Sequence, residues 1–399
     1  MKKRIVVYSI IPLLLVALSG CWSKKELDNL AVVTGIGVDV VDEGYEITVQ
    51  IINPAEVAAK QLTTRTAVST YSATGKTMFD AIRNLIEVTP RKVYLSHTRI
   101  VIFSEELAKN GISDTLDFMV RDHELRTDFY LTVAKGSTAK KMLQILTPLE
   151  KIPASKIFAT IETSEKYLAQ TRTVKIQKFT SDLLLKGQHP FLTGIYTDNA
   201  DRIGNSVENV ESIESPAKIF VDHIAVMNND QLVGWLNREE SKGFNYLTGK
   251  VKNSTEIVSC GEEGKYTSFE IIGMDKKIKG EFKSGTPTFT VDIKVKADVA
   301  QNDCKLKLSK PSTIKQLEKK LNKEIKKTTT ASLEAIQNDF QSDIIGFGEL
   351  LHRTRHKDWK KVKSNWDETF PEAEITVNIQ SKIKRTGTIT DSFEGNQKE

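Results

Sequence analysis

The first 21 residues constrain this chain more than any other stretch, because they predict on which side of a membrane its folded body lies. Lys2, Lys3 and Arg4 give a basic start, and an apolar run of 13 residues follows from Ile5 to Ala17. A helix needs about 20 apolar residues to span a bilayer, so this run is too short for a membrane span. Its length and basic flank are typical of a secretory signal peptide, which we assign to residues 1–20.

The end of this segment, Leu18-Ser19-Gly20-Cys21, matches the lipobox at which bacterial lipoproteins are processed. In such proteins the cysteine thiol receives a diacylglycerol, the peptide is cut before the cysteine, and the new N-terminus is acylated. Several acyl chains hold a chain durably, because each buried methylene contributes about 0.8 kcal/mol. We therefore expect Cys21 to be the lipid attachment site and residues 21–29 to be a tether outside the cytoplasm. The alternative is an ordinary signal peptide with a cysteine nearby by chance.

The charge of the chain argues against nucleic acid as a partner. The formal net charge of +5 falls to +2 once the basic start leaves with the signal peptide. Nucleic-acid-binding domains usually carry a clear basic excess. Hydrophobic residues make up 39% and charged residues 27% of the sequence, which is ordinary for a globular body. No later apolar run reaches spanning length, so we expect only Cys21 in lipid.

Two further cysteines remain, Cys260 and Cys304. An oxidising compartment allows a disulfide between them, and two free, buried thiols are the alternative. Their separation is far from the CxxC spacing of redox and metal sites. The sequence leaves both alternatives open, because it does not show whether the two Cβ atoms approach each other.

Hydrophobic patterns divide the mature chain into two regions with an α+β fold. Strand and helix patterns alternate irregularly over residues 30–197, which we expect to form an N-terminal region of one or two subdomains. Residues 198–217 are rich in Asn, Ser, Glu and Gly and predict a linker or an exposed excursion. Residues 218–390 predict a C-terminal domain, and residues 391–399 a loose polar tail. Each region is expected to hold a small mixed or antiparallel sheet covered by helices.

A hairpin, a run of strands and one long helix are expected in the C-terminal region. Ile219–Met227 and Gln231–Leu236 flank turn residues and predict the hairpin. Thr267–Gly273 and Lys277–Lys283 predict separate strands. Ser312–Leu351 keeps one apolar stripe at helical spacing, which predicts a long amphipathic helix. The lysines on its other faces indicate a solvated surface rather than a site for membrane phosphates.

No motif tested for catalysis or metal binding keeps its required pattern, so we expect no catalytic residue, metal or cofactor. His352 and His356 are four residues apart, but Arg353 occupies the place of the glutamate in a zinc metalloprotease. Gly75-Lys76-Thr77 lacks the first glycine of a phosphate-binding loop. Gly35-Ile36-Gly37 lacks the third glycine of a dinucleotide fingerprint, and a close-packed strand accounts for it better. The acidic residues of the predicted linker also have the wrong order for a calcium loop: Asp198, Asp201 and Glu208.

Four groups of segments, spread over the whole mature chain, carry the motifs of one protein family. They are, in chain order, Cys21 to Leu30 with Val33 to Asp39; Arg91 to His97 with Arg121 to Arg126; Gly234 to Asn237 with Glu239 and Glu240; and Asp343 to Gly348 with Trp359, Trp366 and Arg385-Thr386-Gly387. These segments resemble the spore germination receptor C-subunit lipoproteins, the Ger(x)C family of endospore-forming bacteria. One departure is visible, because His356 stands where a proline is expected.

The resemblance implies a body of about three small α+β domains, anchored on the outer face of the spore inner membrane. It also implies two membrane partners, a channel-like A subunit and a transporter-like B subunit that senses the nutrient. The implied function is that of a non-enzymatic subunit of a nutrient germinant receptor, required to trigger germination. Two alternatives stay open: a solute-binding lipoprotein that delivers a ligand to a membrane partner, and an extracytoplasmic hydrolase.

Partner contacts are expected from aromatic residues rather than from charge, because the mature net charge is small. Phe347, Trp359 and Trp366 lie among basic residues after the predicted long helix, and they are the expected contacts with the membrane subunits. The alternative is that each of them belongs to the core of the C-terminal domain.

Overall fold

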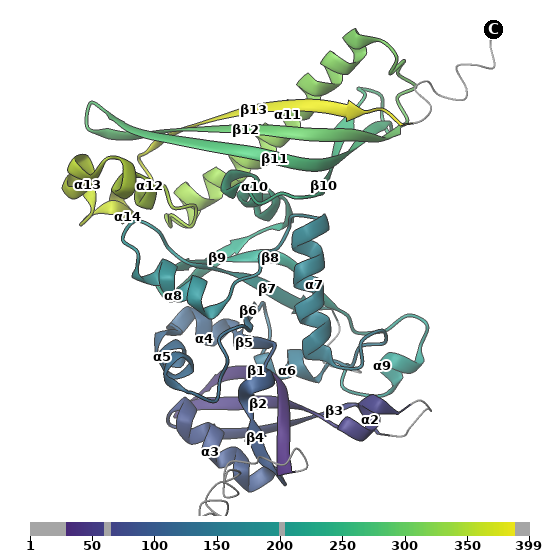
Figure 1. Ribbon diagram of the computed structural model, residues 1–399, viewed down its shortest axis with the longest axis vertical. Helices are drawn as coiled ribbons and strands as arrows, with labels where there is room; N and C mark the ends of the chain where they lie inside the picture. The colour runs from purple at the N-terminus through teal and green to yellow at the C-terminus, as the bar shows by residue number, and fades with distance from the viewer. Residues whose placement is uncertain (1–28, 60–64, 199–203, 388–399) are drawn as a thin grey trace, which may run out of the picture.

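A computed structural model describes residues 29–59, 65–198 and 204–387 of the chain. The body is elongated, and two β-sheets follow each other along its long axis (Figure 1). The first sheet lies near the start of the described chain, and the second sheet with its long helix lies at the opposite end. Both sheets contain parallel and antiparallel pairs and carry helices, so the predicted α+β class is confirmed.

The first sheet has nine strands among the described residues, in the order β3-β2-β1-β5-β6-β7-β8-β9, with β4 pairing on β1. β1, β5, β6 and β7 are parallel in its centre, and antiparallel strands extend it on both sides. The strands are β1 (Leu30–Val41), β2 (Gly44–Ile52), β3 (Val68–Gly75), β4 (Lys92–Tyr94), β5 (Ile100–Ser104), β6 (Tyr130–Ala134), β7 (Phe191–Thr197), β8 (Ile219–Asn228) and β9 (Gln231–Leu236).

Residues 198–217 connect two hydrogen-bonded neighbours of this sheet. β7 and β8 pair antiparallel, from Phe191 opposite Val226 to Thr197 opposite Ile219. β8 and β9 form the predicted hairpin, which therefore completes the first sheet. The step to the second sheet comes after β9, and a division of the chain into domains at residues 198–217 stays a prediction.

Helices cover both faces of the first sheet. Along β5, Ile100 and Ile102 face one apolar cluster, and Val101 and Phe103 face the other, because successive side chains of a strand point to opposite faces. One face is covered by α6 (Ala139–Gln144) and α7 (Pro153–Tyr167). The other face is covered by α3 (Met78–Val88), α4 (Glu105–Asn110), α5 (Ser113–Arg121) and α8 (Ile176–Leu184).

Two glycines of β1 let helices come close to the sheet. A Cβ atom at Gly35 would lie 2.9 Å from the Cβ atom of Ala154, and one at Gly37 would lie 3.1 Å from that of Ala139. Asp39, further along β1, accepts hydrogen bonds from the backbone N–H groups of Ala139 and Lys140 at the start of α6. Close packing of this strand, predicted from its glycines, is confirmed.

The second sheet has the order β10-β11-β12-β13. Its strands are β10 (Ser254–Ser259), β11 (Tyr266–Lys283), β12 (Thr286–Asn302) and β13 (Glu374–Arg385). The long helix α11 (Pro311–Glu334) packs along it, and α10 (Arg238–Thr248) lies between the two sheets. Gly243 lets α10 and α11 touch, because a Cβ atom there would collide with the backbone oxygen of Thr328. One apolar cluster runs continuously from the first sheet to the second.

Two predictions for the C-terminal region were wrong in part. The long helix exists, but it ends with a π-helical turn at Ala335–Asp339 and does not reach Leu351. The chain then turns through Gln341, whose φ is +50°. The Ser342 hydroxyl donates to the backbone oxygen of Met227 on β8, so this stretch bonds to the first sheet instead of continuing the helix. β11 is one strand of 18 residues rather than two, because bulges let it bend without breaking.

Shorter helices complete the described chain. They are α2 (Pro54–Ala58), the 3₁₀ turn Leu95–His97, α9 (Glu208–Glu211), α12 (Phe347–Thr354), α13 (His356–Val362) and α14 (Trp366–Thr369). No helix within the described ranges has both the length and the apolar composition that crossing a bilayer requires.

Candidate functional site

The candidate site is a set of buried polar contacts that connect the first sheet to the second. We call it the junction. It consists of the segment 168–174 after α7, helix α10, the segment 187–189 before β7, and the segment 342–348, which leads into the first residues of α12. Each of these segments is a loop or a helix that contacts elements distant in sequence, so the junction exists only in the folded chain.

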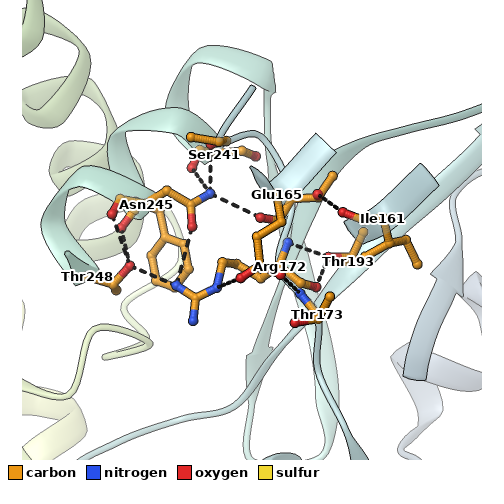
Figure 2. Close-up of polar contacts among 11 residues, drawn as sticks. Ile161, Glu165, Arg172, Thr173, Thr193, Ser241, Asn245 and Thr248 are labelled. Carbon is orange, nitrogen blue, oxygen red and sulfur yellow. Dashed lines mark hydrogen bonds and ion pairs between the residues drawn. The ribbon is translucent and has the colours of Figure 1, made fainter. Parts of the chain in front are cut away.

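Arg172 lies at the centre of the first part of the junction. Its guanidinium Nη1 is 3.4 Å from Asn245 Oδ1 and 3.3 Å from Thr248 Oγ1, both on α10. Its Nε is 3.5 Å from Glu165 Oε1 on α7. Figure 2 shows the guanidinium of Arg172 with Asn245 and Thr248 on one side and Glu165 on the other. Burial lowers the pKa of Arg172, and Glu165 opposes this effect. The cation is therefore held by long contacts and few counter-charges.

The backbone around Arg172 is fixed by shorter hydrogen bonds. Its N–H donates to Thr193 Oγ1 on β7, and the Thr193 hydroxyl donates back to the Arg172 carbonyl over 2.6 Å. The Asn245 amide donates to the backbone oxygen of Ala169 over 2.8 Å. The Ser254 hydroxyl at the start of β10 donates to the backbone oxygen of Leu168. These bonds attach one loop to β7, α10 and β10 together.

A buried ion pair on α10 reaches the second sheet. Lys242 Nζ is 3.2 Å from Glu256 Oε2 on β10, and the Tyr246 hydroxyl donates to Glu256 Oε1 over 2.8 Å. Burial raises the pKa of Glu256, although Lys242 and Tyr246 act in the opposite direction. Because Asn245 and Lys242 belong to the same helix, α10 joins the loop after α7 to the second sheet.

Asp343 organises the second part of the junction. Its carboxylate accepts hydrogen bonds from the backbone N–H groups of Gly346, Phe347 and Gly348 and from the Trp366 indole N–H. The carboxylate is fully buried, and burial raises its pKa against these four donors. These four hydrogen bonds to one carboxylate fix the path of the backbone from the end of α11 into α12.

His189 connects this loop to the first sheet. Its backbone N–H donates to the Asp343 carbonyl over 2.9 Å. Its ring Nδ1 accepts from the backbone N–H of Asn229 over 3.0 Å, so the ring proton is on Nε2, which is 3.0 Å from Asp367 Oδ1. The hydrogen bond from His189 lowers the pKa of Asp367. Gly187, two residues earlier, lies directly against Trp359 and Gly348.

The segment Gly234 to Asn237 also has a packing role. Gly234 faces the ring of Phe340, and Trp235 covers Gly194 on β7 so closely that neither glycine has room for a Cβ atom. Asn237 caps α10, since its side chain accepts from the Glu240 N–H while the Glu240 carboxylate accepts from the Asn237 N–H. Local sequence therefore places α10 correctly against the first sheet.

The expectation that Phe347, Trp359 and Trp366 contact a partner is not supported by their positions. Their exposed fractions are 0%, 2% and 3%, so none presents a surface to another protein. Trp359 and Trp366 have ring centroids 5.3 Å apart, and Phe347 packs on Phe289 at 4.5 Å. The expected partner contacts are therefore corrected. Phe347, Trp359 and Trp366 belong to the core, because β12 and the segment 187–189 cover them.

The remaining sequence-derived sites lie outside the junction. Cys21 is outside the described residues. Cys260 and Cys304 are joined as a disulfide, with Cα atoms 5.7 Å apart, between the end of β10 and the turn after β12. The rings of His352 and His356 are 5.5 Å apart. In the part of the chain that the structure describes, no three His, Cys, Asp or Glu residues gather as metal ligands would.

Sequence reasoning did not single out Arg172, Asn245, His189 or Glu256. Among these four residues, only Asn245 has a local sequence signal, because it is a polar residue on the buried side of α10. Arg172 and Asn245 are 73 residues apart, and no motif joins them. Asp343 was noticed as part of a family motif, but its four donors follow only from the fold.

Comparison with known proteins identifies the chain. A family model described as spore germination protein N-terminal domain matches residues 23–197, and one described as spore germination B3/GerAC like, C-terminal, matches residues 222–387. Spore germination protein KC of Bacillus subtilis (strain 168) is 31% identical over 395 residues, which cover 97% of each chain. The chain belongs to the Ger(x)C family of spore germination proteins. The resemblance seen in its motifs is thereby confirmed.

Other Ger(x)C relatives agree along the whole length. Spore germination protein B3 of the same bacterium is 25% identical and covers 96% of this chain and 98% of its own. The crystal structure of the GerBC protein superimposes with a TM-score of 0.53 at 19% identity, covering 88% of this chain and 96% of that one. The two proteins share a fold. Membership of the family gives this chain a role in spore germination.

Proposed function

We propose that this chain is the lipid-anchored, non-enzymatic subunit of a nutrient germinant receptor. It is held by Cys21 at the outer face of the spore inner membrane, where it assembles with a channel-like A subunit and a transporter-like B subunit. The observation that carries the proposal is the match to spore germination protein KC over 97% of both chains. The lipobox at Leu18–Cys21 supports the anchor. The incomplete catalytic motifs of the sequence support a role without enzymatic turnover.

The architecture supports a mechanical part in such a receptor. The first sheet begins with β1 at Leu30, nine positions after the expected anchor Cys21 in the sequence, and the second sheet lies at the opposite end of the body (Figure 1). Between them, Arg172, Asn245 and Asp343 hold α10 and the loop before α12 in place. A displacement of the second sheet by a partner is therefore transmitted to the membrane-proximal sheet rather than absorbed by a loose linker.

The test is a deletion of the gene in its own host, followed by germination assays with a panel of amino acids and sugars. We expect the loss of the response to one group of nutrients and its return when the wild-type gene is restored. Restoration with Cys21→Ala should leave the protein unprocessed or released from the membrane and should not recover the full response. Ser23→Ala, two residues beyond the lipobox cysteine, is the matched control and should behave as wild type.

Three outcomes contradict the proposal. Unchanged germination with every nutrient would remove the receptor role. Tight binding of a nutrient by the purified body alone would favour the solute-binding alternative. Turnover of peptidoglycan or peptide substrates, abolished by a single substitution, would favour the hydrolase alternative.

A further inference from the structure

Helix α3 carries apolar side chains on two faces. Met78, Ala81 and Leu85 face the first sheet and are buried. Phe79 and Ile86 point away from the sheet and are 52% and 56% exposed. The outer face of a helix on a globular protein is normally polar. An apolar outer face therefore indicates a second contact that the described residues do not make.

Helix α5 and strand β4 extend this outer face into a groove of about 290 Å³. Its apolar lining is Phe79, Ile82, Ile86, Val93, Leu95 and Phe118. We call it the α3–α5 groove. A contiguous exposed apolar surface on a protein marks a binding face for a protein or a membrane.

The groove lies where the described chain begins. Leu30, the first residue of β1, is in register with Lys92 of β4, and Lys92 and Val93 line the groove. Asn29 follows Cys21 by eight positions, and an extended chain spans at most about 3.5 Å per residue, so the anchor lies within about 28 Å of Asn29. A lipid anchor on Cys21 therefore keeps the groove within reach of the bilayer.

The charges around the groove are largely neutralised within the protein. Lys92 Nζ is 2.5 Å from Glu124 Oε1, and Arg121 Nε is 2.7 Å from Asp117 Oδ2. The Arg83 guanidinium stacks over the Phe79 ring at 4.8 Å. Paired charges at the rim and an apolar floor fit the boundary between headgroups and acyl chains, where apolar side chains are buried to a depth of about 5–10 Å.

We propose that the α3–α5 groove rests on the lipid bilayer, so that Phe79 and Ile86 enter the headgroup boundary. The inference rests on the lipid-anchored subunit proposed above and adds the face with which that subunit meets the membrane. Together, the anchor and this face orient the body so that its long axis points away from the bilayer and the second sheet does not contact lipid. Burial of apolar side chains drives the contact, so it depends little on salt or on anionic lipid.

The lysine-rich face of α11 is a different surface and does not meet the same bilayer. α11 packs along the second sheet, at the end of the body opposite α3 and β4 (Figure 1). With the groove on the membrane, these lysines point into solvent. This agrees with the solvated role expected for them.

The experiment uses the full chain, processed with its own signal peptide and reconstituted in vesicles of phosphatidylethanolamine and phosphatidylglycerol. Phe79→Cys or Ile86→Cys carries an environment-sensitive fluorophore. Ile257→Cys on β10 is the matched control, because Ile257 is 52% exposed but belongs to the second sheet. We expect a blue shift and quenching by brominated lipid at positions 79 and 86, at least fivefold stronger than at position 257, and the same result at low and high salt.

Each other outcome overturns the inference in a distinguishable way. If the chain fails to float with the vesicles, the anchor fails, and the proposed function loses its membrane attachment together with this face. If the chain floats but labels at 79 and 86 behave like the label at 257, only the face is wrong. If these labels shift only when the membrane subunits are added and brominated lipid does not quench them, the groove binds a protein instead.

Discussion

The Trp366 indole N–H lies 3.2 Å from Asp343 Oδ2 and completes a set of four donors around a fully buried carboxylate. The other three donors are consecutive backbone N–H groups of residues 346–348. A buried charge is expensive unless hydrogen bonds compensate for it. Here the compensation comes from the loop that the carboxylate shapes, so the loop and the charge stabilise each other.

Asp343→Asn is expected to lower the free energy of unfolding by about 2–3 kcal/mol, because an amide turns an N–H₂ group toward donors and leaves them unpaired. Trp366→Phe keeps an aromatic ring but loses the indole N–H donor and part of the buried volume, so about 1–3 kcal/mol is expected. Asp358→Asn is the control, since Asp358 forms a surface ion pair with Lys361 and should change stability by less than about 0.5 kcal/mol. Urea unfolding measures all three, and equal values for Asp343 and Asp358 would contradict the assigned role.

The contact between Arg172 and Asn245 predicts energetic coupling between the loop after α7 and helix α10. In a double-mutant cycle with Arg172→Met and Asn245→Ala, we expect an interaction energy of about 1 kcal/mol or more, because both residues share one buried network. The exposed pair Arg126 and Asp128 provides the control, with a coupling below about 0.5 kcal/mol. Chemical denaturation of the four proteins in each cycle gives the result. Strict additivity for Arg172 and Asn245 would show that their contact carries no energy.

The disulfide between Cys260 and Cys304 predicts a large effect of reduction. The bond closes a loop with a sequence separation of 44 residues, and constraint of the unfolded chain by such a loop contributes up to about 4 kcal/mol. Cys260→Ser with Cys304→Ser should lower the unfolding free energy by a comparable amount, and reductant should lower it in the wild type only. Mass spectrometry with alkylation, without and with reduction, tests the pairing directly. Two alkylated thiols before reduction would refute it.

Local patterns predicted those parts of the fold that local physics determines. β1, β2 and the hairpin of β8 and β9 follow from runs and alternation of apolar residues. The pairing of β7 with β8 across residues 198–217 was not predictable, because a polar stretch between two strands looks the same within a sheet and between domains. Partner order in a sheet depends on contacts that the chain makes only after it has folded.

The same limit explains the aromatic residues near the C-terminus. Trp359 and Trp366 follow a cationic stretch, and local composition suggested an exposed surface. In the fold, Gly187 and Phe289, which are distant in sequence, cover them. Arg172 was missed for the same reason, since its partners on α10 are more than 70 residues away. The resemblance of the motifs indicated the function, whereas the candidate site follows only from tertiary contacts.

Asp222 on β8 predicts a loss of stability in acid. Burial opposes its ionisation, but hydrogen bonds from His223 and Arg238 outweigh burial and lower its pKa to about 2. Tyr196 on β7 also donates to it. Because the pKa is lower in the folded chain than the usual value of about 3.9, the stabilisation is complete above pH 4 and is lost as the pH falls toward 2, up to about 2–3 kcal/mol. Asp222→Asn should flatten stability over this range, whereas Asp128→Asn at an exposed site should not. An unchanged slope for Asp222→Asn would contradict the assignment.

Gly187 predicts a steric effect that can be separated from backbone strain. Its φ is +86°, and an added Cβ atom would lie 2.9 Å from the Cα atom of Gly348 and closer still to the Trp359 ring. Gly136 has a φ of +66° but nothing within 4 Å of an added Cβ atom, so Gly136→Ala measures strain alone, about 1–2 kcal/mol. Gly187→Ala adds overpacking of about 1–3 kcal/mol.

Thermal unfolding should therefore rank Gly187→Ala well below Gly136→Ala, and tryptophan fluorescence should change only for the variant at position 187. Because Gly187 presses on the loop that Asp343 shapes, the same variant should weaken the junction and reduce germination when it replaces the wild-type gene. Equal stabilities and unchanged fluorescence would show that the chain moves aside at position 187, and that the close contact with Trp359 does not hold the two sheets together.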